Sequence, residues 1–165
     1  MKKIICLLLC CISLLVFFGC AEEEPEVEQG LCLYYPVAQR SYQPGSSAIG
    51  SEARALDEQA ALDQILDVYF LGPEAEHLLP IFPSELRIVK TAIEDKTVYI
   101  TVSSHMAELS GLKLTIACAC LTLTTLELTG AETVVINAED ALLDGQKSIT
   151  MDKNNLLLTD IWQEE

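Results

Sequence analysis

The side chains of this 165-residue chain that could carry out catalysis do not form a known motif. A hydrolase nucleophile elbow has the pattern G-x-S-x-G, whereas Gly45-Ser46-Ser47-Ala48 lacks the second glycine. The two histidines are His77, which follows Glu76, and His105, which follows Ser103-Ser104 at the end of an expected strand. A cysteine–histidine pair would need a thiol that we expect to be buried. The sequence therefore predicts no catalytic residues and a protein that is not an enzyme.

Metal ligands are the second kind of chemistry to consider. Oxygen-bearing side chains gather at Asn137, Glu139, Asp140 and Asp144, a composition that suits calcium. Their spacing does not fit the D-x-D-x-D-G loop, so a polar turn is the expected structure. H-E-x-x-H, the P-loop and G-x-G-x-x-G are absent, and none of the 25 acids forms an evident glycosidase pair. We predict no metal site and no cofactor.

The seven cysteines divide into three groups by position. Cys6, Cys10 and Cys11 lie in an apolar N-terminal run, and Cys20 closes that run. The remaining three are Cys32, Cys118 and Cys120. An odd number argues against a disulfide framework, although one bridge from Cys32 to either of the others is possible in an exported protein. Neighbours two apart on a helix point to different sides, so we expect Cys118 and Cys120 to be buried free thiols.

The N-terminal 19 residues explain why an acidic chain has a mean hydropathy of +0.31. Lys2-Lys3 is a short positive region, and Ile4–Phe18 is apolar apart from one serine. Fifteen residues are fewer than the roughly 20 that span a membrane comfortably, which favours a secretory signal at residues 1–19. The small residue Gly19 directly before Cys20 resembles the lipobox of bacterial lipoproteins.

The lipobox resemblance implies that the Cys20 thiol receives a diacylglyceryl group and that the signal is cut before it. Phe17 and Phe18 depart from the usual pattern, in which leucine and a small residue are commoner. The alternative is an uncleaved N-terminal anchor in which Cys20 has no role. Either interpretation places the rest of the chain outside the cytoplasmic membrane, attached to its outer face.

Residues 20–30 are the expected tether between this anchor and the folded domain. Five glutamates within seven residues repel one another and cannot pack, which predicts an extended segment. Without residues 1–19, the chain loses two lysines and no acid, so its formal charge changes from −15 to −17. Phosphate binding needs clustered lysine and arginine, so nucleic acid is excluded as a partner. The folded domain should occupy residues 31–165.

Several elements of this domain can be predicted from residue patterns. Leu31–Tyr35 should be a strand that ends at Pro36, Ser41–Ser51 a loop, and Glu52–Leu56 a second strand. Asp57 is expected to cap a helix that ends before Gly72-Pro73. The apolar stripe of this helix consists of Leu62, Ile65, Leu66, Tyr69 and Phe70.

The second half predicts a hairpin, a long helix and further strands. The hairpin joins Leu86–Ile93 to Thr97–Val102. Met106–Leu128 has both helical and strand periodicity, and its length favours a helix. The remaining predicted elements are the strand Glu132–Asn137 and a C-terminal hairpin of Ser148–Met151 with Leu156–Thr159. This β(β)αββαβ order predicts an α+β fold, a two-layer sandwich.

The order of these landmarks resembles the GerMN domain. The resemblance covers about Leu31–Leu158 and rests on Leu33-Tyr34-Tyr35-Pro36, the Ala60–Leu71 helix, Pro83-Ser84, Val98–Ser103, Leu121-Thr122-Leu123-Thr124 and Glu132–Asn137. It implies a surface lipoprotein with a role in sporulation or germination, built like the ring-building modules of secretion-type assemblies. GerM carries the domain in tandem, whereas this chain has one copy, and Ala138–Leu143 departs from the expected glycine-containing turn.

The sequence thus favours a non-enzymatic, lipid-anchored domain that binds other envelope proteins. A second hypothesis is that the domain binds cell-wall glycan or another small ligand. Its candidate residues are the aromatic side chains of Tyr34, Tyr35, Tyr42 and Trp162, on which sugars stack. Because neighbours on a strand point to opposite faces, one of Tyr34 and Tyr35 should belong to the core.

Overall fold

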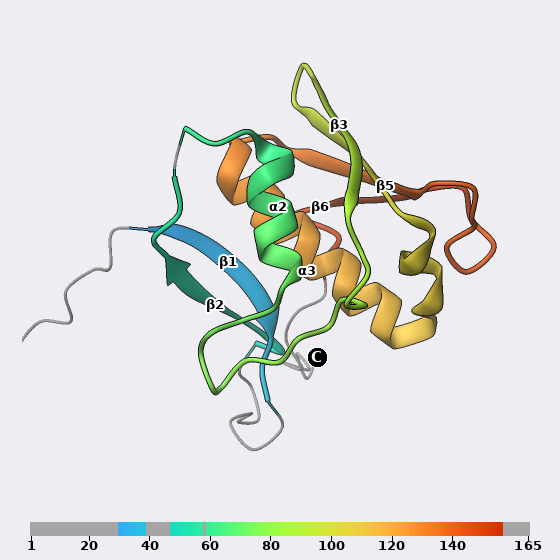
Figure 1. Ribbon diagram of the computed structural model, residues 1–165. Helices are drawn as coiled ribbons and strands as arrows, with labels where there is room; N and C mark the ends of the chain where they lie inside the picture. The colour runs from blue at the N-terminus through green and yellow to red at the C-terminus, as the bar shows by residue number, and fades with distance from the viewer. Residues whose placement is uncertain (1–29, 39–46, 58, 157–165) are drawn as a thin grey trace, which may run out of the picture.

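The computed structural model of the chain describes residues 30–38, 47–57 and 59–156, and these form an α+β fold (Figure 1). The element order is β1 (Leu31–Pro36), β2 (Ile49–Arg54), α2 (Leu62–Phe70), β3 (Ile88–Glu94), β4 (Thr97–Val102), η3 (Ser104–Glu108), α3 (Gly111–Thr129), β5 (Thr133–Ala138) and β6 (Ile149–Asp152). The predicted fold class and order are therefore confirmed. Cys20 and residues 21–29 of the expected tether lie outside the described residues.

The larger sheet has the strand order β3-β4-β5-β6. β3 and β4 form the predicted antiparallel hairpin, β4 and β5 run parallel with α3 as their crossover, and β6 is antiparallel to β5. The side chains of Val98, Ile100, Val134 and Ile136 alternate with less buried neighbours and are fully buried. This period-two pattern shows that one face of the sheet carries the core.

The smaller sheet is an antiparallel ribbon of β1 and β2. Leu33 and Tyr35 of β1 are fully buried and belong to the same core as Leu66 and Tyr69 of α2. The Tyr35 hydroxyl donates to the carbonyl of Tyr69 at 2.9 Å, and the Tyr69 hydroxyl donates to the carbonyl of Tyr34 at 2.7 Å. These two bonds satisfy both buried phenols and fix α2 against β1.

A buried ion pair connects β2 to the loop after α2. Arg54 pairs with Glu52, and its guanidinium also donates to the carbonyl of Gly72 at 2.9 Å. Glu52 in turn accepts the backbone N–H groups of Glu74 and Ala75 at 3.0 and 2.8 Å. These bonds hold both charges where their side chains are 9% exposed, and only the Nε of Arg54 has no hydrogen-bond partner within this described group.

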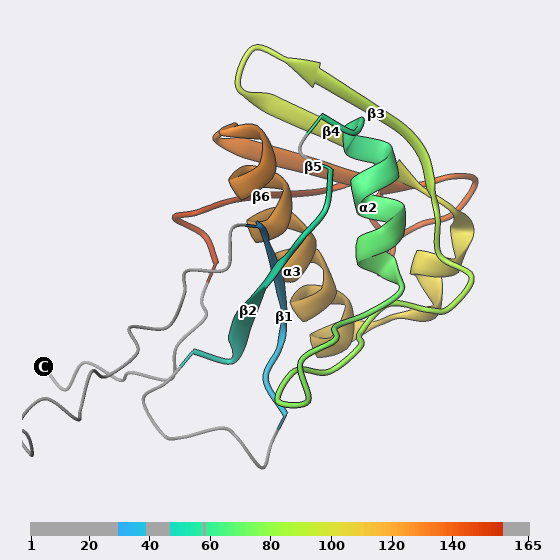
Figure 2. The same cartoon turned by 60° about the vertical axis from the view of Figure 1, so that its left-hand side comes forward.

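Helix α3 lies between the ribbon and the larger sheet, with contacts to β1 on one side and to β5 and β6 on the other (Figures 1 and 2). All six residues from Ala117 to Thr122 are buried, so this middle part of the helix is enclosed on every side. A helix that is buried all round lacks the apolar stripe of a surface helix. The ribbon thus covers the side of α3 that faces away from the larger sheet.

By length and apolar composition alone, α3 passes the test for a membrane-spanning helix. It also has the properties of a core helix, because 56% of its most apolar window is buried inside the described fold. The Oγ1 atom of Thr124 accepts the backbone N–H of Tyr34 at 2.9 Å. Gly130 ends the helix in the left-handed conformation, at a φ of 68°. We therefore assign α3 to the core.

Three details differ from the predictions. Asp57 does not cap α2; its carboxylate accepts the N–H of Gln59 at 2.9 Å, and the helix begins after Ala61. The predicted Ser41–Ser51 loop is too long, because β2 already begins at Ile49, where it pairs with Pro36. The first strand of the predicted C-terminal hairpin pairs with β5 instead, and residues 157–159 of its second strand lie outside the described residues.

Candidate functional site

The three cysteines of the domain are free thiols. Cys118 and Cys120 are fully buried, whereas Cys32 is partly buried in β1. Burial raises the pKa of Cys118 to about 12, with a smaller contribution from the charge of Asp144, and burial also raises the pKa of Cys120. Because the thiolate is the nucleophile and the metal ligand, these two cysteines are chemically inert at neutral pH. The predicted buried free thiols are confirmed.

A hydrogen-bonded chain of Ser103, His105 and Glu85 is the arrangement closest to catalytic machinery. Ser103 follows Val102, the last residue of β4, and precedes η3, in which His105 lies two residues later. The Ser103 Oγ lies 3.2 Å from His105 Nδ1, and His105 Nε2 lies 3.0 Å from Glu85 Oε2. The order of types matches a serine–histidine–acid relay.

The exposure of these three hydrogen-bonded side chains is the reverse of what hydrolysis needs. Ser103 is 1% exposed, while the side chain of Glu85 is 76% exposed. A nucleophile must reach substrate and the orienting acid must be shielded, so this geometry connects the loop before β3 to η3 and does not present an attacking hydroxyl. The position of Ser103 before His105 was visible in the sequence. Glu85 was missed, because no local pattern indicates a contact between residues 20 positions apart.

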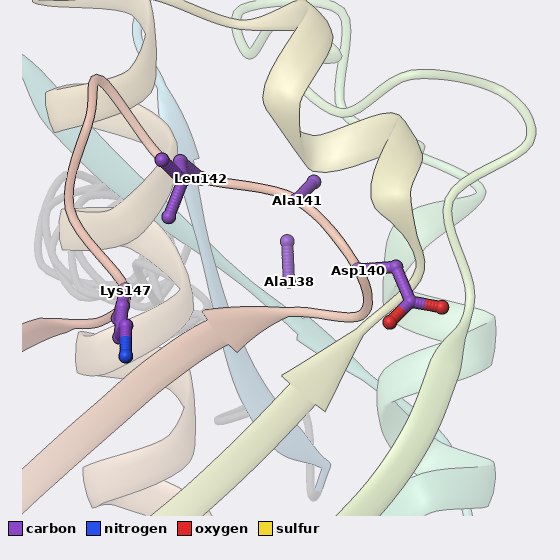
Figure 3. A pocket seen from close by; sticks show the side chains of 5 residues that line it. All are labelled: Ala138, Asp140, Ala141, Leu142 and Lys147. Atoms are coloured by element: carbon purple, nitrogen blue, oxygen red, sulfur yellow. The ribbon is translucent and has the colours of Figure 1, made fainter.

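An open hollow lies where β5 ends, next to the loop that leads to β6 (Figure 3). It has a volume of about 410 Å³ and is lined by Ala138, Asp140, Ala141, Leu142 and Lys147. Figure 3 shows Asp140 and Lys147 on opposite sides, with the small alanine side chains between them. Ligand sites usually combine an enclosed apolar pocket with several converging polar groups. This hollow has one acid and one base that do not converge.

The oxygen-rich residues that suggested calcium are not brought together. Asn137 forms hydrogen bonds with Thr101 across the β4–β5 pair. Asp144 accepts the backbone N–H of Gly111 at 2.8 Å and thereby caps the start of α3. Glu139 and Asp140 are exposed in a turn, as expected. Within residues 30–38, 47–57 and 59–156, no group of three or more acidic, histidine or cysteine side chains is placed to hold a metal ion.

The aromatic residues proposed for glycan binding do not form a platform in the part of the chain that is described. Tyr35 is fully buried, which confirms that one of the two tyrosines belongs to the core. Tyr34 is partly buried, and burial, together with the nearby Cys32, raises its pKa to about 12. Tyr42 and Trp162 lie outside the described residues, as does the predicted lipidation site Cys20.

The chain matches no protein-family model and no curated protein, so the GerMN resemblance has no support from a family match. Among solved structures, it is similar to a crystal structure of a candidate lipoprotein from Clostridium perfringens, at 20% sequence identity and a TM-score of 0.45. The alignment covers 76% of this chain and 87% of the other. A likeness at this level carries no conclusion about function.

Proposed function

We propose that this chain is an extracytoplasmic lipoprotein, attached through Cys20 to the outer face of the cytoplasmic membrane, whose single domain binds other proteins of the cell envelope. The observation that carries the proposal is the order of segments in the sequence. An apolar run closed by Gly19-Cys20 is followed by a run of glutamates and then by a folded α+β domain. Two acyl chains on one residue are sufficient for stable membrane attachment.

The domain itself favours binding over catalysis. The buried thiols of Cys118 and Cys120 are held protonated, and the serine–histidine–acid chain seen in the described part of the domain has the serine inside and the acid outside. These groups are used for packing and for connecting loops. The GerMN resemblance would place the protein in sporulation or germination, and that part of the proposal rests on the resemblance alone.

The anchor is tested by Cys20→Ser, with Cys32→Ser as the matched control. Fractionation of the expressing cells should move the Cys20→Ser protein out of the detergent-soluble membrane fraction, because the acceptor thiol for the lipid is gone. The Cys32→Ser protein should stay with the membrane. Membrane retention of the Cys20→Ser protein at the level of the control would contradict the lipid anchor.

Protein binding is tested by crosslinking in intact cells, followed by identification of the adducts. The proposal expects a small, reproducible set of envelope proteins. The competing function is tested on the same preparation by titration with cell-wall glycan fragments, with Trp162 fluorescence as the readout. Saturable glycan binding without any defined protein adduct would replace the proposal with the glycan-binding alternative.

A further inference from the structure

The β1–β2 ribbon has one edge that is covered and one that no other described segment of the chain covers. The backbone N–H of Val37 donates to the carbonyl of Ala48 at 3.0 Å, which sets the alternation of the ladder. Residues at every second position of β1 therefore direct their backbone groups away from β2. Accordingly, the N–H of Tyr34 donates to Thr124 in α3, and the carbonyl of Pro36 accepts the N–H of Leu79 at 2.9 Å. The outer edge of β1 is thus occupied.

On β2, the same alternation turns Ser51 and Ala53 outward. They are the partners of Tyr34 and Cys32, so their backbone N–H and carbonyl groups point away from β1. Both residues are exposed, and β2 has no second strand beside it within the described residues. Figure 1 shows β2 on the side of β1 that faces away from α2 and α3. An edge with unpaired backbone groups is a template for another strand.

Two of the devices that usually protect an edge, an irregular register and a short strand, are present on the larger sheet but not on β2. On the larger sheet, β3 has a register irregularity at its start, where the N–H of Ile88 is bound by Asp67 at 2.9 Å. The opposite edge strand, β6, has only four residues. β2 has six residues, and the side chains beside its outward groups are a hydroxymethyl and a methyl group. Nothing bulky on Ser51 or Ala53 prevents the approach of a second backbone.

The charges near this edge favour a positively charged occupant. Arg54, the one basic residue of β2, is 8% exposed and is engaged by Glu52 and Gly72. Its Nε also lies 3.5 Å from Oε1 of Glu74, whose side chain is 80% exposed. Asp57, just beyond the strand, is exposed as well. An approaching segment therefore meets exposed acids, and a second copy of this chain, with its net charge of −15, would be repelled.

We propose that β2 is the docking site of the domain, where an extended, lysine- or arginine-bearing segment of a partner protein adds as a third strand of the ribbon. This inference rests on the proposed protein-binding function and names its surface and the chemistry of its partner. Backbone hydrogen bonds to Ser51 and Ala53 would supply affinity. The exposed carboxylates would select basic segments and speed their association.

The test uses the full chain in nonionic detergent micelles and a fluorescent eight-residue peptide of alternating valine and lysine. Peptide binding is measured by anisotropy for the unmodified chain, for Ala53→Pro and for Ala53→Thr. Proline removes an outward N–H but no bond to β1, while threonine keeps the N–H and suits a strand. We expect Ala53→Pro to weaken binding about tenfold, as loss of one or two hydrogen bonds implies. Ala53→Thr should bind like the unmodified chain.

Two further probes keep the test independent of the folding of the proline variant. A peptide with alternate N-methyl groups lacks donors for the edge and should bind about tenfold more weakly to the unmodified chain. A glutamate version should also bind more weakly, since it meets like charge. Equal binding of the N-methylated peptide would overturn the edge as the site, and equal binding of the glutamate peptide would overturn the basic partner.

Two outcomes separate this inference from the proposed function. If cellular crosslinking recovers the same partners from Ala53→Pro as from the unmodified chain, the protein-binding function stands and the β2 site is overturned. If sedimentation shows a dimer that Ala53→Pro abolishes, the occupant is a second copy of the chain, and the proposed partner is overturned.

Discussion

Cys118 and Cys120 lie two residues apart in α3, and the surrounding core keeps both in the neutral form. The sequence predicted that both are buried. Residues two apart on a helix point to different sides, so both could face water only if the helix were exposed on two sides, and this helix is long and apolar. The contact between His105 and Glu85 did not follow from the sequence, since it joins residues from different segments. The burial of side chains within one element was therefore predictable, whereas contacts between side chains of different elements could be seen only in the fold.

The raised pKa of Cys118 predicts a loss of stability in alkali. An unfolded thiol ionises near its ordinary pKa of 9.0, while the folded thiol remains protonated up to about pH 12. The unfolded state therefore releases its proton first, and stability is lost as the pH rises between these values. Each such thiol should lower the free energy of unfolding by about 1.4 kcal/mol per pH unit in this window.

The measurement is urea unfolding of the detergent-extracted protein at several pH values from neutral to strongly alkaline. Cys118→Ala should reduce the pH slope by the contribution of one thiol, whatever it does to stability at neutral pH. Ala117→Gly is the control, because it alters the same buried part of α3 without removing a thiol, and it should keep the pH slope of the unmodified protein. An unchanged slope in Cys118→Ala would contradict the assignment.

At the scale of elements, α3 shows why hydrophobic periodicity alone did not decide between a helix and a strand for Met106–Leu128. Its buried positions include consecutive residues, so neither the helical nor the strand period dominates. The limits of β2 and α2 were also misplaced. β2 extends to Ile49 because β1 pairs with it there, and that partner is not visible in the local sequence. Element types were predictable from length and turn residues, but boundaries that depend on distant partners were not.

The cap of α3 comes from a distant loop, and its contribution can be measured with a matched pair. Asp144 and Asp140 are both exposed and both have positive φ angles, of 47° and 53°. Glycine relieves the backbone equally at either position, but only Asp144 accepts the N–H of Gly111. Asp144→Gly should therefore be less stable than Asp140→Gly by about 1 kcal/mol.

Thermal and urea unfolding of the two glycine variants give this difference directly. Asp144→Asn should lie between Asp144→Gly and the unmodified protein, because the amide oxygen still accepts the bond but the charge is lost. Equal stability of the two glycine variants would show that the Asp144 contact contributes nothing.

For the whole molecule, the main electrostatic property is a formal charge of −15 over 165 residues. Like charges repel one another in the compact state, and salt screens them over about 10 Å at 0.1 M. We therefore expect the free energy of unfolding to rise by about 1 kcal/mol between low salt and about 0.5 M sodium chloride.

Potassium chloride is the control for this salt effect, and it should act equally, because screening does not depend on the identity of a monovalent cation. Calcium chloride at matched ionic strength distinguishes screening from binding at the acidic turn of Glu139 and Asp140. A constant or falling free energy of unfolding with added sodium chloride would show that repulsion between carboxylates does not lower the stability of the folded state.

If the chain is anchored as proposed, the place where residues 20–30 join the domain has a mechanical consequence. Gly30 lies against β2, where a Cβ atom would come within 2.7 Å of the Arg54 carbonyl oxygen, and β1 begins at the next residue. A pull on the proposed anchor would reach β1 first, and a partner held on β2 would resist it one strand away. A force along the strand direction would load all six residue pairs of the ribbon in shear at the same time. Tension would then pass from membrane to partner through two strands, without stretching the larger sheet.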